Sequence, residues 1–301
     1  MDRRILEQAV RHCRVVPGRK LDLARHPADW LPVEPRGSAH KAELKDRGEE
    51  LLEESRQRLA AAQEVLWASD SHAMLVILQG LDAAGKDGII KHVVGCVNPM
   101  GVQVTSFRAP NAEELDHDFL WRAARRLPER GQIGVFNRSY YEEVLVVRVH
   151  PEFLAPQRLP IPAGPALWQS RYRSIRDFER HLGANGTVVR KFFLNVSKEE
   201  QSKQLIERID DPTKFWKFNP GDAKERAHWQ DYMAAFAEAL PATSTQDAPW
   251  YVIPADRKWF ARALVAHILT RTIEGLKLTL PQPSAKDRAA MAAARRLLAG
   301  R

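Results

Sequence analysis

The chain has 301 residues, of which 44% are hydrophobic, so it can bury a core and is not a chain that is disordered throughout. Its 46 Lys and Arg against 38 Asp and Glu leave a formal charge of +8, which favours nucleic acid, an acidic membrane or a phosphate-rich substrate as partner. No run approaches the ~20 apolar residues of a spanning helix, and no signal peptide or cysteine motif is present. We therefore expect a cytoplasmic protein that binds no membrane.

Apolar runs and helical spacing predict strands that alternate with helices. We expect a proline-rich, irregular arm over 1–37 and a long helix over 38–69. The expected strands are 74–79, 102–107, 133–136, 188–196 and 250–253, and the later helices are 89–96, 111–127, 166–182, 198–209, one containing Trp229, Met233 and Phe236, and 257–278. This alternation predicts an α/β fold with a parallel sheet covered on both faces. We expect one domain, 1–301, with a helical lid over 198–228 and a tail over 282–301 that is a peripheral helix or a frayed end.

A glycine-rich loop, GLDAAGKDG at 80–88, lies directly after the first expected strand and opens a helix. It contains the pattern G-x-x-x-x-G-K, whose glycines let backbone N–H groups point into one concavity beside a helix N-terminus. Lys86 then reaches the outer phosphates of a ligand. The residues expected to bind phosphate here, besides Lys86, are Gly80, Ala83, Ala84, Gly85, Asp87, Gly88 and Lys91.

The loop departs from the usual motif in its polar side chains. Asp87 occupies the position where Ser or Thr normally binds magnesium, and a second carboxylate, Asp82, lies inside the loop. A carboxylate beside a phosphate is repelled unless a cation or a proton lies between them. Asp82 is therefore our candidate for a magnesium-linked or phosphate-activating acid, with a turn-capping role as the alternative. Asp87 is more simply explained as a first-turn acid favoured by the helix dipole.

Two further segments carry candidate phosphate ligands. The strand 133–136 is followed by Asn137 instead of a metal-binding aspartate, and then by Arg138, which can bind two phosphate oxygens at once. The segment 171–182, RYRSIRDFERHL, places Arg173, Arg176 and Arg180 along one helical face. Such a row, together with Arg171, suits a long polyanion; the alternative is a surface face whose arginines pair with neighbouring acids.

Five stretches of the chain resemble the family-2 polyphosphate kinases. They are LQGLDAAGKDGIIKHV at 78–93, VFNRSYYEEVLVVRV at 135–149, RYRSIRDFERHL at 171–182, KFFLNVSKEEQSKQLIERIDDPTKFWKF at 191–218 and APWYVIPADRKWF at 248–260. The resemblance extends to about Gln282 and leaves the C-terminal tail outside. It implies a three-layer α/β/α P-loop kinase fold similar to thymidylate kinases, with a helical lid and assembly into homodimers or homotetramers.

The same resemblance implies a reaction and a set of residues. The reaction is reversible phosphoryl transfer between inorganic polyphosphate and a nucleoside mono- or diphosphate of adenine, with guanine as an alternative, and it needs Mg²⁺, with Mn²⁺ as an alternative ion. Asp82, Lys86 and Arg138 match the family's catalytic residues, and Asp82 its metal-linked aspartate. Arg208, Lys214 and Lys217 match basic lid positions, although without the resemblance this segment also fits a solvated amphipathic loop. Asn137 and Glu142 match positions at the nucleotide, and Glu143 replaces the more usual Asp there.

Two other functions compete with this one. An ATP-dependent nucleotide kinase of thymidylate-kinase type fits the loop, but Asp87 after the lysine and Asn137 at the strand end argue against it. A nucleic-acid-binding module fits the positive charge, but no helix-turn-helix, zinc-finger or RNA-binding signature supports it, so we expect no nucleic-acid partner.

Overall fold

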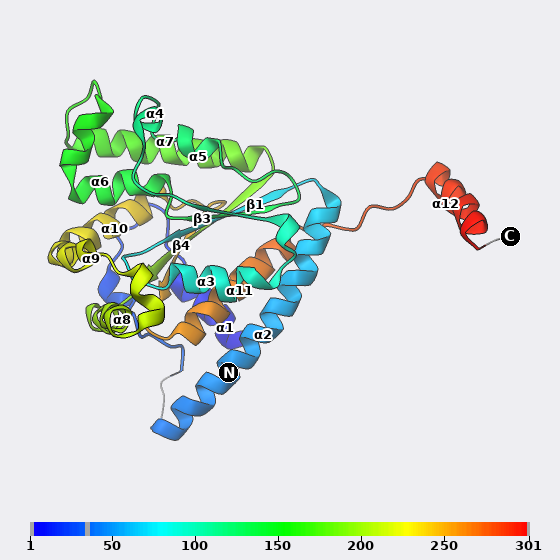
Figure 1. Cartoon of the computed structure of the whole chain (residues 1–301), viewed down its shortest axis with the longest axis horizontal. Coiled ribbons are helices and arrows are strands. Elements are labelled where there is room, and N and C mark those ends of the chain that lie inside the picture. The colour runs from blue at the N-terminus through cyan, green and yellow to red at the C-terminus, as the bar shows by residue number, and fades with distance from the viewer. Residues whose placement is uncertain (1–2, 34–36, 300–301) are drawn as a thin grey trace.

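A five-stranded parallel sheet forms the centre of the computed structural model, which describes residues 3–33 and 37–299 (Figure 1). The strands are β1 (Ala73–Gln79), β2 (Val102–Ser106), β3 (Ile133–Asn137), β4 (Thr187–Asn195) and β5 (Trp250–Pro254), in the order β2-β3-β1-β4-β5. Every residue of β1 is buried, as expected of a central parallel strand covered on both faces. The predicted parallel α/β sheet is confirmed.

The helices cover both faces of this sheet. The α-helices are α1 (Arg3–Cys13), α2 (Ser38–Ser69), α3 (Lys86–His92), α4 (Ala112–Leu115), α5 (Trp121–Ala124), α6 (Val146–Val149), α7 (Pro165–Ala184), α8 (Lys198–Asp210), α9 (Pro220–Glu225), α10 (Trp229–Thr243), α11 (Lys258–Gly275) and α12 (Ala285–Leu298). Short 3₁₀ turns include η1 (Leu23–Arg25), η4 (Tyr140–Val144), η5 (Pro151–Gln157), η6 (Pro212–Lys217) and η7 (Arg226–His228). Among the residues described, no helix is long and apolar enough to cross a membrane.

The alternation of side chains along β1 separates the core into two parts. Val76 faces a cluster that contains residues of α1, α2, α3 and α11, whereas Ile77 faces one built with η4, α7 and α10. Figure 1 shows α2, α3 and α11 on one side of the sheet and α6 and α7 on the other. Because neighbouring strands are all parallel, the carboxyl ends of the five strands lie at a single edge of the sheet, where α/β proteins bind ligands.

Two predicted elements were wrong. The arm over 1–37 begins with a helix, α1, because Leu6, Ala9 and Cys13 form an apolar stripe that is buried against α11. The helix expected over 111–127 is instead two single turns, α4 and α5. Asp118 separates them, since its side chain accepts a hydrogen bond from the backbone N–H of Leu120 and closes a turn.

The lid and tail segments are both helical. Residues 198–228 fold as α8, η6, α9 and η7, at the edge of the sheet where the strands end. The tail contains α12, whose described residues are all exposed and which stands away from the rest of the chain in Figure 1.

Candidate active site

The loop after β1 has the backbone of a phosphate-binding cradle. Gly80 has φ of +154°, and a Cβ there would lie 2.9 Å from the carbonyl oxygen of Leu194. Gly85, at +100°, is the residue before α3 and turns the chain into the helix. Ala83 also has a positive φ, 64°, which costs a non-glycine residue free energy and is typical of functional loops.

Lys86 lies folded over this loop. Its Nζ donates to the carbonyl oxygens of Gly80, at 2.6 Å, and Leu81, at 3.0 Å, and the side chain is buried. Burial, reinforced by the charge of Arg138, lowers the pKa of Lys86 to about 8, although nearby carboxylates oppose the shift. The amine is thus held inside the cradle where an anion that bound the loop would meet it.

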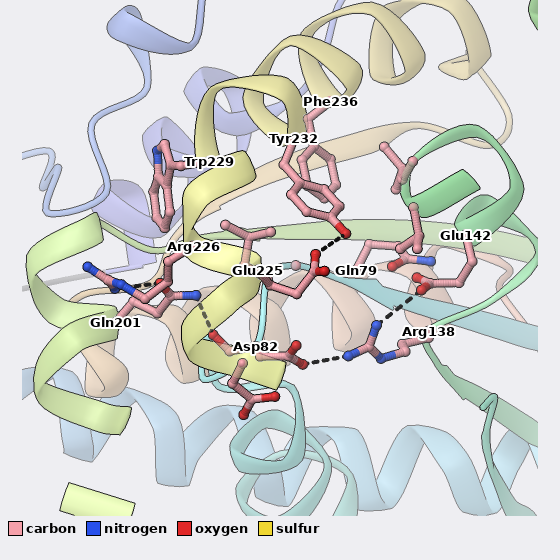
Figure 2. A pocket seen from close by; sticks show the side chains of 15 residues that line it. Gln79, Asp82, Arg138, Glu142, Gln201, Glu225, Arg226, Trp229, Tyr232 and Phe236 are labelled. Carbon is pink, nitrogen blue, oxygen red and sulfur yellow. Dashed lines mark hydrogen bonds and ion pairs between the residues drawn. The ribbon is translucent and has the colours of Figure 1, made fainter. Parts of the chain in front are cut away.

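Arg138 lies at the centre of the site, between two carboxylates. It follows β3 in the left-handed region, at φ of 62°, and this turn sends its guanidinium back over the loop. Its nitrogens contact Asp82 at 2.5 Å and Glu142 at 3.1 Å (Figure 2). Burial alone would raise the pKa of Asp82, but Lys86 and Arg138 hold it below its usual range, so the carboxylate is ionised.

A fully buried cluster beneath η4 supports the turn that carries Arg138. The hydroxyls of Tyr140 and Tyr141 donate to Glu179 of α7 at 2.9 and 2.8 Å, and Lys191 of β4 contacts the same carboxylate at 2.5 Å. Both tyrosines come shortly after Arg138 in the chain. The cluster therefore fixes the turn to the sheet and to α7.

Two hollows meet at Arg138. Both are lined by Asp82, Arg138 and Asp222. The first is a narrow cavity of ≈ 40 Å³ with Trp229, Tyr232 and Phe236 in its wall (Figure 2). Its remaining lining residues are Gln79, Gly80, Leu81, Glu142, Leu145, Val146, Gln201, Glu225 and Arg226. The narrow cavity thus combines an aromatic wall with carboxylates and two arginines.

The second hollow is a wide groove of ≈ 740 Å³, which shares Asp82 and Arg138 with the narrow cavity. Cations outnumber acids in its lining. The cations, besides Arg138, are Lys86, Lys91, Arg108, Arg208, Lys214, Lys217, Lys258 and Arg262, and the acids are Asp82, Asp87, Glu207 and Asp222. The excess of positive charge that composition alone could not locate is therefore concentrated in the wide groove.

The lid segment contacts the loop directly. Gln201 of α8 donates to the carbonyl oxygen of Asp82 at 2.9 Å, and Lys217 of η6 lies 3.4 Å from the carboxylate of Asp87. Arg208 pairs with Asp222 within the lid, at 3.0 Å. Burial and the nearby charge of Asp82 raise the pKa of Asp222. The predicted lid residues Arg208, Lys214 and Lys217 therefore share the wide groove with the loop.

The arginines of α7 lie away from both hollows, so their role in binding polyphosphate stays a prediction. Arg171 is buried and contacts Glu143 at 3.0 Å, so these two charges neutralise each other. Arg176 donates to the carbonyl oxygen of Ala242, and Arg173 is exposed. None of these residues lines either hollow, Glu143 included. The segment is helical, as its spacing predicted, but the sequence does not show which face of α7 packs against the sheet.

Several residues of the two hollows were missed by the sequence analysis. Lys258 and Arg262 begin α11, directly after β5, and Arg108 follows β2. The signal was present, because each comes soon after the carboxyl end of a strand in a parallel sheet. Arg226 and Tyr232 line the narrow cavity from the lid and α10, and no local pattern marks them.

Oxygen ligands for a divalent cation are present beside the loop. Asp82 and Asp87 supply carboxylates, Asn137 donates to Asp87 at 3.1 Å, and its buried Oδ1 lacks a hydrogen-bond partner among the described residues. Over the same described part of the chain, no three His, Cys, Asp or Glu side chains form a complete metal-binding group. This set fits Mg²⁺, which keeps several waters and takes one or two carboxylates together with substrate phosphates.

The comparisons with known proteins agree with this geometry. The model of the family "Polyphosphate kinase 2" matches residues 42–281. An ADP-polyphosphate phosphotransferase of Rhodopseudomonas palustris is 50% identical over 271 residues, 89% of this chain and 91% of that protein. An AMP/ADP-polyphosphate phosphotransferase of Meiothermus ruber is 49% identical over 227 residues, which is 75% of this chain and 81% of that protein.

A solved structure shows the same relationship in three dimensions. The crystal structure of polyphosphate kinase 2 from Arthrobacter aurescens TC1 superposes with a TM-score of 0.79 at 42% identity, and it covers 93% of this chain and 95% of that one. The family match spans the glycine-rich loop, Arg138, the lid and all of α11. With the loop, the sheet order and these matches together, the chain belongs to the polyphosphate kinase 2 family.

Proposed function

We propose that this protein transfers a phosphoryl group between inorganic polyphosphate and a nucleoside mono- or diphosphate. The names of its relatives in Rhodopseudomonas palustris and Meiothermus ruber describe this reaction with ADP or with AMP and ADP. The observation that carries the proposal is the position of Arg138 and Asp82, which line both hollows. A transfer between two phosphate compounds needs two binding sites that meet at one reacting phosphoryl group.

The two hollows differ in the way that the two substrates differ. The wide groove is basic and suits polyphosphate, whose end would lie in the cradle between Gly80 and Lys86. The narrow cavity has an aromatic wall and suits the nucleoside part of AMP or ADP, with Glu142 beside it. Since ≈ 40 Å³ is little more than room for water, the lid has to move before a nucleotide enters.

Alignment and electrostatics supply most of the rate in such a reaction, so no covalent protein nucleophile is required. Lys86, Arg138 and the lid cations Arg208, Lys214 and Lys217 neutralise the charge of the transferring group. Asp82 holds the guanidinium of Arg138 toward the reacting phosphate and, as an ionised carboxylate, orients the acceptor.

Kinases of this family generally need a divalent metal ion. We propose that the ion is Mg²⁺, with Mn²⁺ as an alternative, and that Asp82 holds it with Asp87 and Asn137 nearby. When bound, the ion neutralises phosphate charge.

A donor and acceptor assay tests the proposal. Purified protein is incubated with AMP or ADP, Mg²⁺ and either polyphosphate or ATP as the sole donor, and the nucleotide products are separated. We expect ADP or ATP to form from polyphosphate. Formation of product from AMP with ATP alone, and none with polyphosphate, would show an ATP-dependent nucleotide kinase instead.

Three further proposals follow, of which only the assembly rests on the family resemblance. We propose that residues 1–301 act as one domain in the cytoplasm and assemble into a homodimer or homotetramer. Light scattering coupled to size-exclusion chromatography measures the mass directly, and a monomer at micromolar concentration would contradict the assembly.

A further inference from the structure

The described residues before 34 precede the matched residues 42–281, and Arg14 and Val15 among them run beside β5, the outermost strand of the sheet. Arg14 forms an antiparallel bridge with Tyr251 of β5, and the N–H of Val15 donates to the carbonyl oxygen of Trp250 at 2.9 Å. The chain then turns through η1 toward the carboxyl ends of β4 and β5. The segment thus reaches the carboxyl ends of the strands, where the glycine-rich loop also lies.

Residues 26–29, which we call the arm tip, accept three hydrogen bonds through their backbone carbonyls. Asn195, the last residue of β4, donates its side-chain amide to His26 at 2.8 Å. The N–H of Asp256 donates to Ala28, and the guanidinium of Arg257 donates to Asp29, both at 3.1 Å. All three donors lie where a strand of the sheet ends.

Asp256 connects the arm tip to the lid. Its Oδ1 accepts a hydrogen bond from the N–H of Ser197 at 2.8 Å, and the hydroxyl of Ser197 caps the start of α8 by accepting from Glu200. Ser197 is thus the residue at which β4 passes into the lid, and we call it the lid hinge. The chain of contacts runs from Ala28 through Asp256 to this hinge.

The same loop also aims cations into the wide groove. Residues 255–257 join β5 to α11, whose Lys258 and Arg262 line that groove. Lys258 donates to Gln204 of α8 at 2.7 Å, which ties the start of α11 to the lid a second time. A displacement of the loop would therefore move both the lid hinge and the groove cations.

We propose that the arm tip, acting through Asp256, positions the lid hinge and the α11 cations for phosphoryl transfer. Asp256 lines neither hollow and therefore does not touch the substrates, so it is a positioning residue. Trp30 holds the arm tip in place, because its ring stacks on His12 of α1 at 3.9 Å and packs near Phe260 of α11. The proposal rests on the proposed function and extends it to a segment that is outside the matched part of the chain.

Asp256→Ala and Asp256→Asn test the contact between Asp256 and Ser197, and Trp30→Ala tests the arm tip. The alanine variant removes the acceptor for Ser197, whereas asparagine keeps an oxygen there, so rescue by Asn separates positioning from loss of charge. We expect Asp256→Ala to lower kcat with saturating polyphosphate and ADP about tenfold, because a small misalignment is costly in such a reaction. Asp256→Asn should recover most of that loss, and both variants should unfold within a few degrees of the parent protein.

Asp29→Ala is the matched control, since its exposed side chain is removed while the carbonyl that binds Arg257 remains; its kcat should be that of the parent. Trp30→Ala loosens the arm tip without touching the hinge, and it carries the test if Asp256→Ala does not fold. The proposal is overturned if either Asp256→Ala or Trp30→Ala keeps the parent's kcat, or if Asn fails to rescue Asp256→Ala. An inactive parent protein would instead overturn the proposed function.

Discussion

Two charged clusters flank the turn after β3, and they differ in exposure. In the outer cluster, the side chains of Arg138 and Asp82 are 34% and 31% exposed and border both hollows. In the inner cluster, Lys191 and Glu179 are 0% and 1% exposed, and protein groups fill their hydrogen-bonding positions. The inner charges cannot exchange partners without unfolding, whereas the outer ones can exchange a carboxylate for a phosphate. The comparison assigns stability to one cluster and chemistry to the other.

The largest effect on activity should follow from Arg138→Ala. An arginine that neutralises the transferring phosphoryl group contributes on the order of 10³-fold or more to kcat, so we expect a loss of that size with polyphosphate and ADP. The free energy of unfolding should change little, because the side chain is one-third exposed. Steady-state kinetics and a urea titration measure the two quantities. A large loss of stability with modest loss of kcat would place Arg138 with the inner cluster.

Lys191→Met should show the opposite behaviour. Removing one partner leaves Glu179 as an unpaired buried charge, and such changes cost about 3–5 kcal/mol of unfolding free energy. Urea denaturation followed by tryptophan fluorescence measures it. The control is the double variant Lys191→Met with Glu179→Leu, which removes both charges and should be more stable than the single one. Equal stability of Lys191→Met and the parent would show that this pair does not hold the fold.

Asp82→Asn should lower kcat about 10²-fold, the usual effect of removing one oriented polar group from a transition state. It removes both a partner of Arg138 and the carboxylate assigned to the ion, so the Mg²⁺ concentration needed for half-maximal rate should rise as well. Asp116→Asn, whose carboxylate pairs with Arg158 on the surface, is a matched control that should leave both quantities unchanged. Near-parental turnover of Asp82→Asn would remove this residue from the mechanism.

The smallest expected effect is on the pH profile. Since the pKa of Lys86 is lowered to about 8, its amine is charged below that pH and loses its charge above it. We therefore expect kcat/KM for polyphosphate to fall as the pH rises through about 8, and kcat to fall only at higher pH, because bound phosphate favours the charged amine. Lys86→Arg, which stays charged, should be slower but should lack the alkaline fall. A profile for the parent protein that is flat to pH 10 would contradict this role.

How much the sequence revealed depended on the range of the interactions. The glycine-rich loop and Arg138 are marked by local patterns directly after strands, and the structure places them together at the hollows. The burial of Arg171 was not visible, because its partner Glu143 lies 28 residues away on another element and the pairing depends on how α7 packs. The helix α1 was missed because the prolines of the arm suggested an irregular segment, although all of them follow Cys13. The stripe of Leu6, Ala9 and Cys13 has helical spacing in the sequence, and the structure buries it against α11.

The two carboxylates on Arg138 also have a consequence for selectivity among anions. Without substrate, the guanidinium is neutralised on both sides by Asp82 and Glu142, so a chloride ion or a single small anion has little net charge to bind. On the proposed function, we expect a ligand that carries several phosphates to contact the loop, the lid cations and Arg138 together, and the summed contacts to displace these internal partners. Because both hollows share this arginine, we expect each substrate to change the affinity for the other, and by the same factor. We therefore expect the site to discriminate among anions by the number of linked charges that each one carries.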